Sequence, residues 1–187
     1  MFDFGGTDGS PGTSQNVDSL GPPNIRFKTA DDANIDTNNP IPVPTSGTKY
    51  SYWKHIYLKC TGAPSSQCDN FKFYTDGSGF GTGITLKVGD EMPTKNSGSS
   101  SGYEVATGTE GDTGDEMVAN HSGITSSTDA FTYTSASPKS VSVSESGNII
   151  DAVGETTNYL VFQLEVDSTA SPGNLADETL TFQYDEI

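Results

Sequence analysis

The chain has 187 residues, with 9 Lys and Arg against 25 Asp and Glu, so its formal net charge is −16. This charge repels phosphate backbones and anionic lipids, which argues against a nucleic-acid or membrane partner bound through a basic surface. Hydrophobic residues make up 32% of the chain and charged residues only 18%. With 8 Tyr and 9 Phe available for a core, the composition predicts one folded, turn-rich β domain rather than a disordered chain.

The first 23 residues are rich in glycine and proline and show no alternation of apolar and polar side chains. We therefore expect a flexible N-terminal arm over residues 1–23, followed by a folded domain over residues 24–187. Phe2 and Phe4 are apolar, and we expect this interaction arm to bury them in an adjacent subunit. The start has neither the basic nor the apolar region of a signal peptide, and no apolar run approaches the roughly 20 residues of a membrane span.

Short aromatic or β-branched runs, bounded by Gly, Pro, Asn or Asp, recur along the rest of the chain and are typical of strands. They cover residues 24–28, 50–60, 70–75, 84–88, 130–134, 140–144, 148–153, 158–166 and 178–184. No window has the i, i+3, i+4, i+7 spacing of an amphipathic helix. The sequence thus predicts an all-β fold with under about a tenth of its residues in helices, arranged as a two-sheet sandwich of jelly-roll or immunoglobulin-like type with an extended N-terminal arm.

A long insertion, at about residues 89–129, interrupts the series of predicted strands. It is either a surface excursion or the seam between two subdomains. Charge is distributed unevenly around it, since residues 1–95 hold 8 basic and 10 acidic residues, and the remainder holds 1 basic and 15 acidic residues. We expect most carboxylates of this second half to face outward, because they repel one another.

Two clusters of oxygen ligands could hold Ca²⁺, which takes six to eight such ligands from flexible loops. In the first, Asp32, Asn34 and Asp36 stand at alternate positions, as at the start of a calcium loop, although Thr37 replaces the usual glycine. The second cluster consists of Glu110, Asp112, Asp115 and Glu116. Solvated loops with Asx turns are the alternative for both clusters. The sequence predicts no cofactor other than this Ca²⁺.

Few other residues offer chemistry. Cys60 and Cys68 lie at the ends of strand-like runs and could close a hairpin as a disulfide, the alternative being two reduced, half-buried thiols. Ser100 lies in a formal G-x-S-x-G match without the strand and helix that a nucleophile elbow needs, so we assign no catalytic residue and expect a protein that is not an enzyme. Trp53 either packs in the core or offers a ring platform for a sugar.

Three segments carry a resemblance to known proteins. They are YSYWKHIYLKC at 50–60, DNFKFYTDGSGFGTGITLKVGD at 69–90 and NYLVFQLEVDSTASPGNLADETLTFQYDEI at 158–187. Together they resemble β-sandwich virion proteins from tailed viruses of bacteria and archaea. The last segment also resembles the terminal strand pair of immunoglobulin-like modules in microbial surface proteins.

The resemblance implies a virion structural protein that decorates or cements a capsid or a surface fibre through arm and sheet-edge contacts. Its location would be the virion, and its partners would be other virion subunits, chiefly the major capsid protein, together with copies of itself in a homo-oligomer. The alternative is a secreted, extracellular carbohydrate-binding or adhesin module of β-sandwich type. The resemblance supplies no catalytic residue.

Overall fold

The computed structural model describes residues 1–17, 25–94, 102–143 and 146–187 of the chain. Strands account for 38% of the residues and helices for 5%, and the sheets are antiparallel. In the described residues the helical segments are short, namely α1 (Met117–Asn120), η2 (Ala130–Thr132) and η3 (Ser146–Asn148). The structure therefore confirms the prediction of an all-β protein with little helix.

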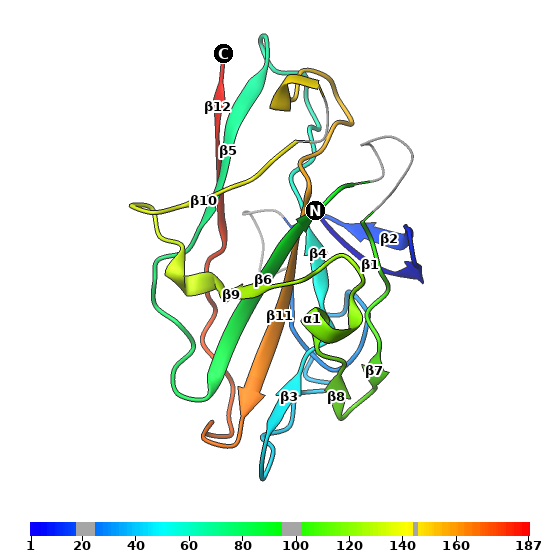
Figure 1. Ribbon diagram of the computed structural model, residues 1–187, viewed down its shortest axis with the longest axis vertical. Coiled ribbons are helices and arrows are strands. Elements are labelled where there is room, and N and C mark those ends of the chain that lie inside the picture. Colours follow the sequence, from blue (N-terminus) through cyan, green and yellow to red (C-terminus); the bar gives the residue numbers. More distant parts are fainter. Residues whose placement is uncertain (18–24, 95–101, 144–145) are drawn as a thin grey trace.

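The larger sheet lies at the centre of the molecule (Figure 1). Its strands are β1 (Phe2–Thr7), β2 (Ser10–Gln15), β3 (Thr48–Tyr50), β4 (Lys54–Ile56), β6 (Ile84–Met92), β9 (Ser127–Asp129) and β11 (Tyr159–Asp167). Within the described residues they follow the order β2-β1-β4-β11-β6-β9, and β3 pairs with the second half of β11. β11 is thus the central strand, with β4 and β3 along one edge and β6 along the other.

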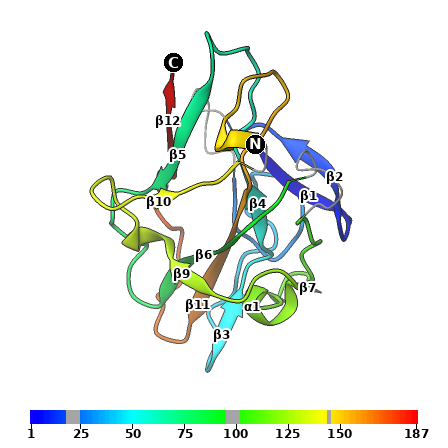
Figure 2. The same cartoon turned by 45° about the horizontal axis from the view of Figure 1, so that its top comes forward.

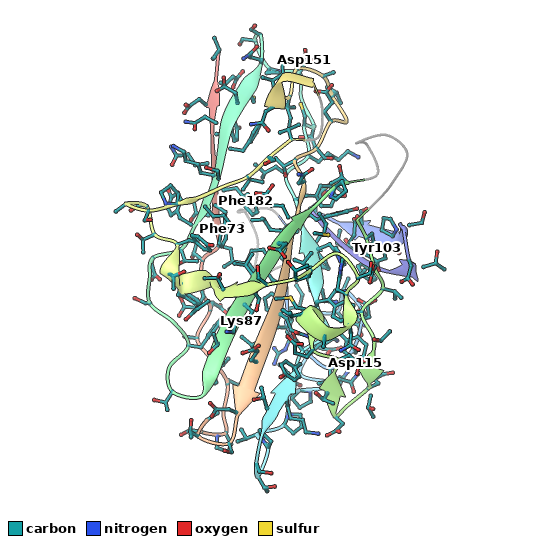
Figure 3. The ribbon with its side chains drawn as sticks, in the orientation of Figure 1. Phe73, Lys87, Tyr103, Asp115, Asp151 and Phe182 are labelled. Carbon is teal, nitrogen blue, oxygen red and sulfur yellow. The ribbon has the colours of Figure 1, made fainter. Side chains whose placement is uncertain are left out.

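The smaller sheet consists of β10 (Lys139–Ser140), β5 (Cys68–Tyr74) and β12 (Thr181–Glu186), in that order. Its inner face packs on the larger sheet, where the ring centroids of Phe73 and Phe162 lie 5.2 Å apart. Phe182 lies 5.6 Å from Phe73 on the neighbouring strand (Figure 3). Leu160 and Leu164 alternate with residues of the opposite face of β11 and join these rings in one apolar core between the two sheets.

The other face of the larger sheet is covered as well, by residues 102–126. This segment contains α1 and a small hairpin of β7 (Gly108–Thr109) and β8 (Thr113–Gly114). In Figure 2, α1 and β7 lie to the right of β11, whereas β5 and β12 lie to the left. Tyr103, Met117 and Ile124 pack there with Trp53 and Val161 in a second core. Residues 102–126 of the predicted insertion therefore form a packed layer and not a surface excursion, whereas residues 95–101 lie outside the described chain.

The N-terminal residues do not form the flexible arm that their composition suggested. β1 pairs with β2 and also with β4 of its own chain, which places Phe2 opposite Ile56. Phe2 is only 2% exposed, and Phe4 packs against the same core. Gly6 has a φ of +108° and lies so close to Gly12 that a Cβ would not fit, so these glycines form a tight hairpin. The expectation of an interaction arm is wrong for residues 1–17, and residues 18–24 lie outside the described chain.

Several other predicted strands have a different structure. Residues 130–134 begin with η2, whose first turn is capped by the Asp129 carboxylate, and β9 lies just before it. Residues 25–28 and 148–153 form no regular strand, yet Phe27 and Ile150 from these segments pack against the first core. Apolar side chains can enter a core from loops, and a short apolar run does not distinguish the two cases.

If the N-terminal hairpin is part of the fold, truncating its buried ring should destabilise the protein. We expect Phe2→Ala to lower the free energy of unfolding by about 3 kcal/mol, because a cavity remains in a packed core. Phe4→Ala, which removes a partly exposed ring of the same strand, should cost about half as much. Urea denaturation measures both values. If neither substitution changed the free energy of unfolding, the interpretation of residues 1–17 as a flexible arm would be restored.

Candidate functional site

The first predicted calcium cluster encloses two lysine side chains. Lys28 and Lys54 are each 1% exposed. The Lys28 Nζ lies 2.8 Å from Asp32 Oδ1 and 3.1 Å from Asp36 Oδ1. The Lys54 Nζ lies 3.3 Å from Asp31 Oδ1 and donates to the Asp32 carbonyl oxygen at 3.1 Å. The carboxylates of this loop therefore bind ammonium groups of their own chain.

These contacts and the burial of the two ammonium groups shift the pKa values of the lysines. Burial opposes the charged form of Lys28, but its hydrogen bonds to Asp32 and Asp36 outweigh burial and raise its pKa. Burial dominates at Lys54 and lowers its pKa in spite of Asp31. The Lys54 ammonium also lies 5.9 and 5.7 Å from the ring centroids of Phe2 and Phe4, so it ties the N-terminal hairpin to the loop. Asn34 makes a local turn, in which its backbone N–H donates to the Asp32 carboxylate at 2.8 Å.

The second predicted cluster is dispersed over different partners. Glu110 accepts from the Asn39 side chain at 3.0 Å, and Asp112 pairs with Lys49 at 2.7 Å. Asp115 accepts from the Thr107 hydroxyl at 2.6 Å. Glu116 caps α1 by accepting from the backbone N–H groups of residues 118 and 119. Among the described residues, no three His, Cys, Asp or Glu side chains come together as metal ligands would.

Both cysteines are free in the structure, so the alternative of two half-buried thiols is the one observed. The Cys60 thiol donates to the Gly62 carbonyl oxygen at 3.1 Å. Ser100 lies outside the described residues.

None of the described carboxylates after residue 101 is buried, which agrees with the expectation that the acidic half faces outward.

The second core holds a polar network that sequence patterns did not indicate. Asp3 is 1% exposed, and its carboxylate accepts from the hydroxyls of Tyr57 at 3.1 Å and Tyr159 at 2.6 Å, and from that of Ser14. Burial raises the pKa of Tyr57 to about 12, so this hydroxyl stays protonated and keeps donating. The network fastens the N-terminal hairpin to β4 and β11.

Next to this network, the chain's two histidines meet. The Nε2 atoms of His55 and His121 lie 3.3 Å apart, although 66 residues separate them in sequence. His121 Nδ1 accepts from the Gly123 N–H at 3.2 Å, and His55 Nε2 accepts from the Glu104 N–H at 3.4 Å. A ring that accepts through a nitrogen is not doubly protonated, so both histidines are neutral in the fold.

Trp53 closes this side of the sheet. It is 1% exposed, its indole N–H donates to the Glu104 carbonyl oxygen at 2.9 Å, and its ring lies 5.8 Å from that of His121. Of the two alternatives for Trp53, the core aromatic is the one observed. It therefore offers no platform for a sugar.

The first core, in contrast, remains open on one side. A groove of about 800 Å³ lies between the apolar face of β6 and β11 and two flanking segments, residues 25–43 and 171–182. Apolar side chains from all parts of this lining are only half-buried, among them Phe27, Ile41, Leu58, Phe80 and Leu180. The chain's only arginine, Arg26, also lines the groove and is half-buried. No local sequence pattern indicates this site, because its residues come from many separate segments of the chain.

A second accessible feature is the outer edge of β12. This strand pairs with β5 along one side, with Thr181 opposite Tyr74 and Glu186 opposite Cys68. No described strand pairs with its other side. Residues 183–187 are exposed, and Tyr184 keeps 49% of its surface in solvent. In Figure 1, β12 stands at the margin of the molecule, with the C-terminus at its tip.

No protein-family model matches the chain, and comparisons with curated proteins and with solved structures give no match either. In the part of the chain that the structure describes, no helix is both long and apolar enough to cross a membrane. The groove, the edge of β12 and the buried polar groups are therefore the candidate functional features of the protein.

The Lys54–Asp31 pair should matter far more for stability than an exposed pair. We expect Asp31→Asn to lower the free energy of unfolding by about 3 kcal/mol, because it leaves a buried ammonium without its countercharge. Asp112→Asn, which breaks the more exposed pair with Lys49, should cost under about 1 kcal/mol. Chemical denaturation of both variants tests this. If Asp31→Asn lowered the free energy of unfolding as little as Asp112→Asn does, the buried Lys54 ammonium would not depend on Asp31.

The histidine pair should make the protein sensitive to mild acid. Burial lowers the pKa of His55 well below 6.5, with His121 and Lys54 adding to the effect, and burial lowers that of His121 although Glu104 opposes it. In the unfolded chain each histidine has its ordinary pKa of about 6.5, so below that pH the unfolded state binds more protons than the folded state. The histidines therefore leave the free energy of unfolding undiminished above that pH and lower it as the pH falls further. We expect a loss of up to about 1.4 kcal/mol per pH unit for each histidine, measured by urea unfolding.

The control removes one titrating ring. His121→Gln should be less stable than the parent at neutral pH, yet its stability should fall less steeply between about pH 6.5 and 5. An unchanged slope would assign the acid sensitivity to other groups.

Proposed function

We propose that the protein is a structural component of a virion, which decorates or cements a capsid or surface fibre by pairing the free edge of β12 with a strand of a neighbouring subunit. We further propose that the fold is a sandwich of jelly-roll or immunoglobulin-like type. The observation that carries it is the unpaired edge of β12 in the described chain. Contacts through an N-terminal arm are not part of the proposal, because β1 pairs within its own chain.

An open edge of this kind suits strand addition. β12 offers a six-residue row of backbone groups with no proline, and such an edge pairs readily with another extended chain. Its side chains beyond Phe182 are exposed, so a partner strand would meet no side chain that must first leave the core. Backbone hydrogen bonds would supply affinity, and the exposed ring of Tyr184 would supply contact area.

Charge indicates what kind of strand would bind. Asp185 and Glu186 lie on this edge, in a chain with a net charge of −16. Pairing two copies would bring like charges together, whereas a strand with Lys or Arg residues would gain from the same field. A capsid subunit with a basic edge strand is therefore the partner that we propose, and further copies of this chain would be held beside it through the lattice.

The alternative of a carbohydrate-binding module receives no support from Trp53, which is buried. Ca²⁺ is not needed in the proposal, because lysine ammonium groups and protein donors already occupy the carboxylates that the sequence analysis singled out. The proposal assigns the protein no enzymatic activity.

The test uses particles purified from the source culture. Immunogold labelling should place the protein on their outer surface, and particles stripped of it should rebind the purified chain. Asp185→Lys should weaken rebinding about fivefold, because it puts a repulsive charge against a basic strand. Absence of label on particles, or full rebinding by the variant, would contradict the proposal.

Two controls separate charge from stability. Asp151→Lys makes the same change on an exposed residue next to Ile150, which bridges Cys68 on the side of β5 away from β12 (Figure 3), and should rebind normally. Asn70→Ala removes the 2.8 Å hydrogen bond between Asn70 and Asp185 without changing charge, and should also rebind normally.

A further inference from the structure

We infer that the groove beside β6 and β11 binds a long-chain carboxylate of the fatty-acid class, with its hydrocarbon chain on the apolar lining and its carboxylate on Arg26. This ligand site goes beyond the proposed function and rests on different residues. Its volume of about 800 Å³ is within the range of small-molecule sites, which are mostly apolar with a few polar groups that fix orientation.

The lining is suited to a hydrocarbon chain. Leu86, Leu164 and Val166 of the central strands belong to it, with Ile41 and Val43 on one flank and Leu180 on the other. Several of these side chains are partly exposed, although they pack against the first core. A hydrocarbon chain would remove this apolar surface from water without bringing in polar groups that need partners.

The flanking segments argue against a peptide in the same place. In residues 40–44, prolines alternate with Ile41 and Val43, and Pro172 lies on the opposite flank. Proline has no N–H, so this lining offers few of the backbone donors that an extended peptide would require along its length. An acyl chain requires none.

Arg26 gives the site its preference for an anionic head group. It lines the groove, it is half-buried, and its side chain makes no ion pair with any described residue. A guanidinium presents a planar fork of donors that matches a carboxylate in bidentate geometry. The acidic residues of the lining, Asp177 and Glu178, belong to the other flank, where Asp177 is exposed and Glu178 is half-buried.

The experiment is a fluorescence titration of the full chain with cis-parinarate, a fluorescent fatty acid, below its micellar concentration. We expect saturable binding to a single class of site, and displacement by palmitate. Methyl palmitate, which lacks the charge, should compete about tenfold less well. Arg26→Gln should weaken palmitate binding about tenfold and leave methyl palmitate unchanged, so that the two compounds bind the variant alike.

A matched pair of variants places the chain in the groove. Ile41→Glu puts a carboxylate into the lining and should abolish binding, whereas Ile35→Glu makes the same change at an exposed isoleucine outside the groove and should bind normally. Thermal melting shows that each variant is folded, and palmitate should raise the melting temperature of the parent and of Ile35→Glu only.

Four results would overturn the inference. They are no saturable binding by the parent, equal affinities for palmitate and its methyl ester, unchanged binding by folded Ile41→Glu, and binding to phosphatidylglycerol vesicles without binding to free fatty acid. Because Asp185 is not part of this site, rebinding of Asp185→Lys to particles is independent of all four.

Discussion

Burial of β11 on both faces is the constraint on which the rest of the fold depends. Its even positions, such as Leu160 and Phe162, need an apolar cover, and the smaller sheet provides one. Its odd positions include Gln163, which is 1% exposed, and a buried amide is costly unless it is hydrogen-bonded. Gln163 donates to the carbonyl oxygens of Ser51 at 2.8 Å and Asp115 at 2.7 Å, and accepts from the Met117 N–H at 2.9 Å. The bonds with Asp115 and Met117 form only when residues 102–126 lie on the sheet, so one side chain of the central strand holds this covering segment in place.

The two faces of that sheet therefore have different chemistry. The second core is closed by directional contacts among histidine, tyrosine and aspartate, and in the described residues no buried side-chain nitrogen or oxygen lacks a partner. The first core is held by non-directional apolar contacts. It is less completely packed near residues 25–43 and 171–182, where apolar side chains remain half-buried. Directional networks specify a unique packing, while an incompletely filled apolar core leaves room for another molecule. Both accessible features, the groove and the edge of β12, are accordingly found on the side of the smaller sheet.

Local patterns predicted β5, β6, β11 and β12 to within a few residues, because aromatic and β-branched runs with period-two alternation carry that information in the strand itself. The N-terminal hairpin was not predictable in the same way, since its glycines allow the two strands to approach closely but have the composition of a linker. At the candidate site, alternating aspartates are equally suited to a metal ion and to an ammonium group, and Lys28, four residues before Asp32, was the signal that could have decided between them. The groove, the order of the strands and the meeting of His55 with His121 depend on contacts between distant segments, which no local pattern encodes.

The burial of Lys28 and Lys54 also determines how the protein responds to amine-reactive reagents. Lys59 is exposed and open to acylation, whereas the other two amines are shielded by the loop and by the rings of the N-terminal hairpin. The terminal amine of Met1 is engaged too, because it donates to the Tyr57 carbonyl oxygen at 2.7 Å. Acylation of Lys54 in a footprinting experiment would therefore report a chain whose hairpin or loop has opened, and labelling confined to the exposed lysines would report the closed form.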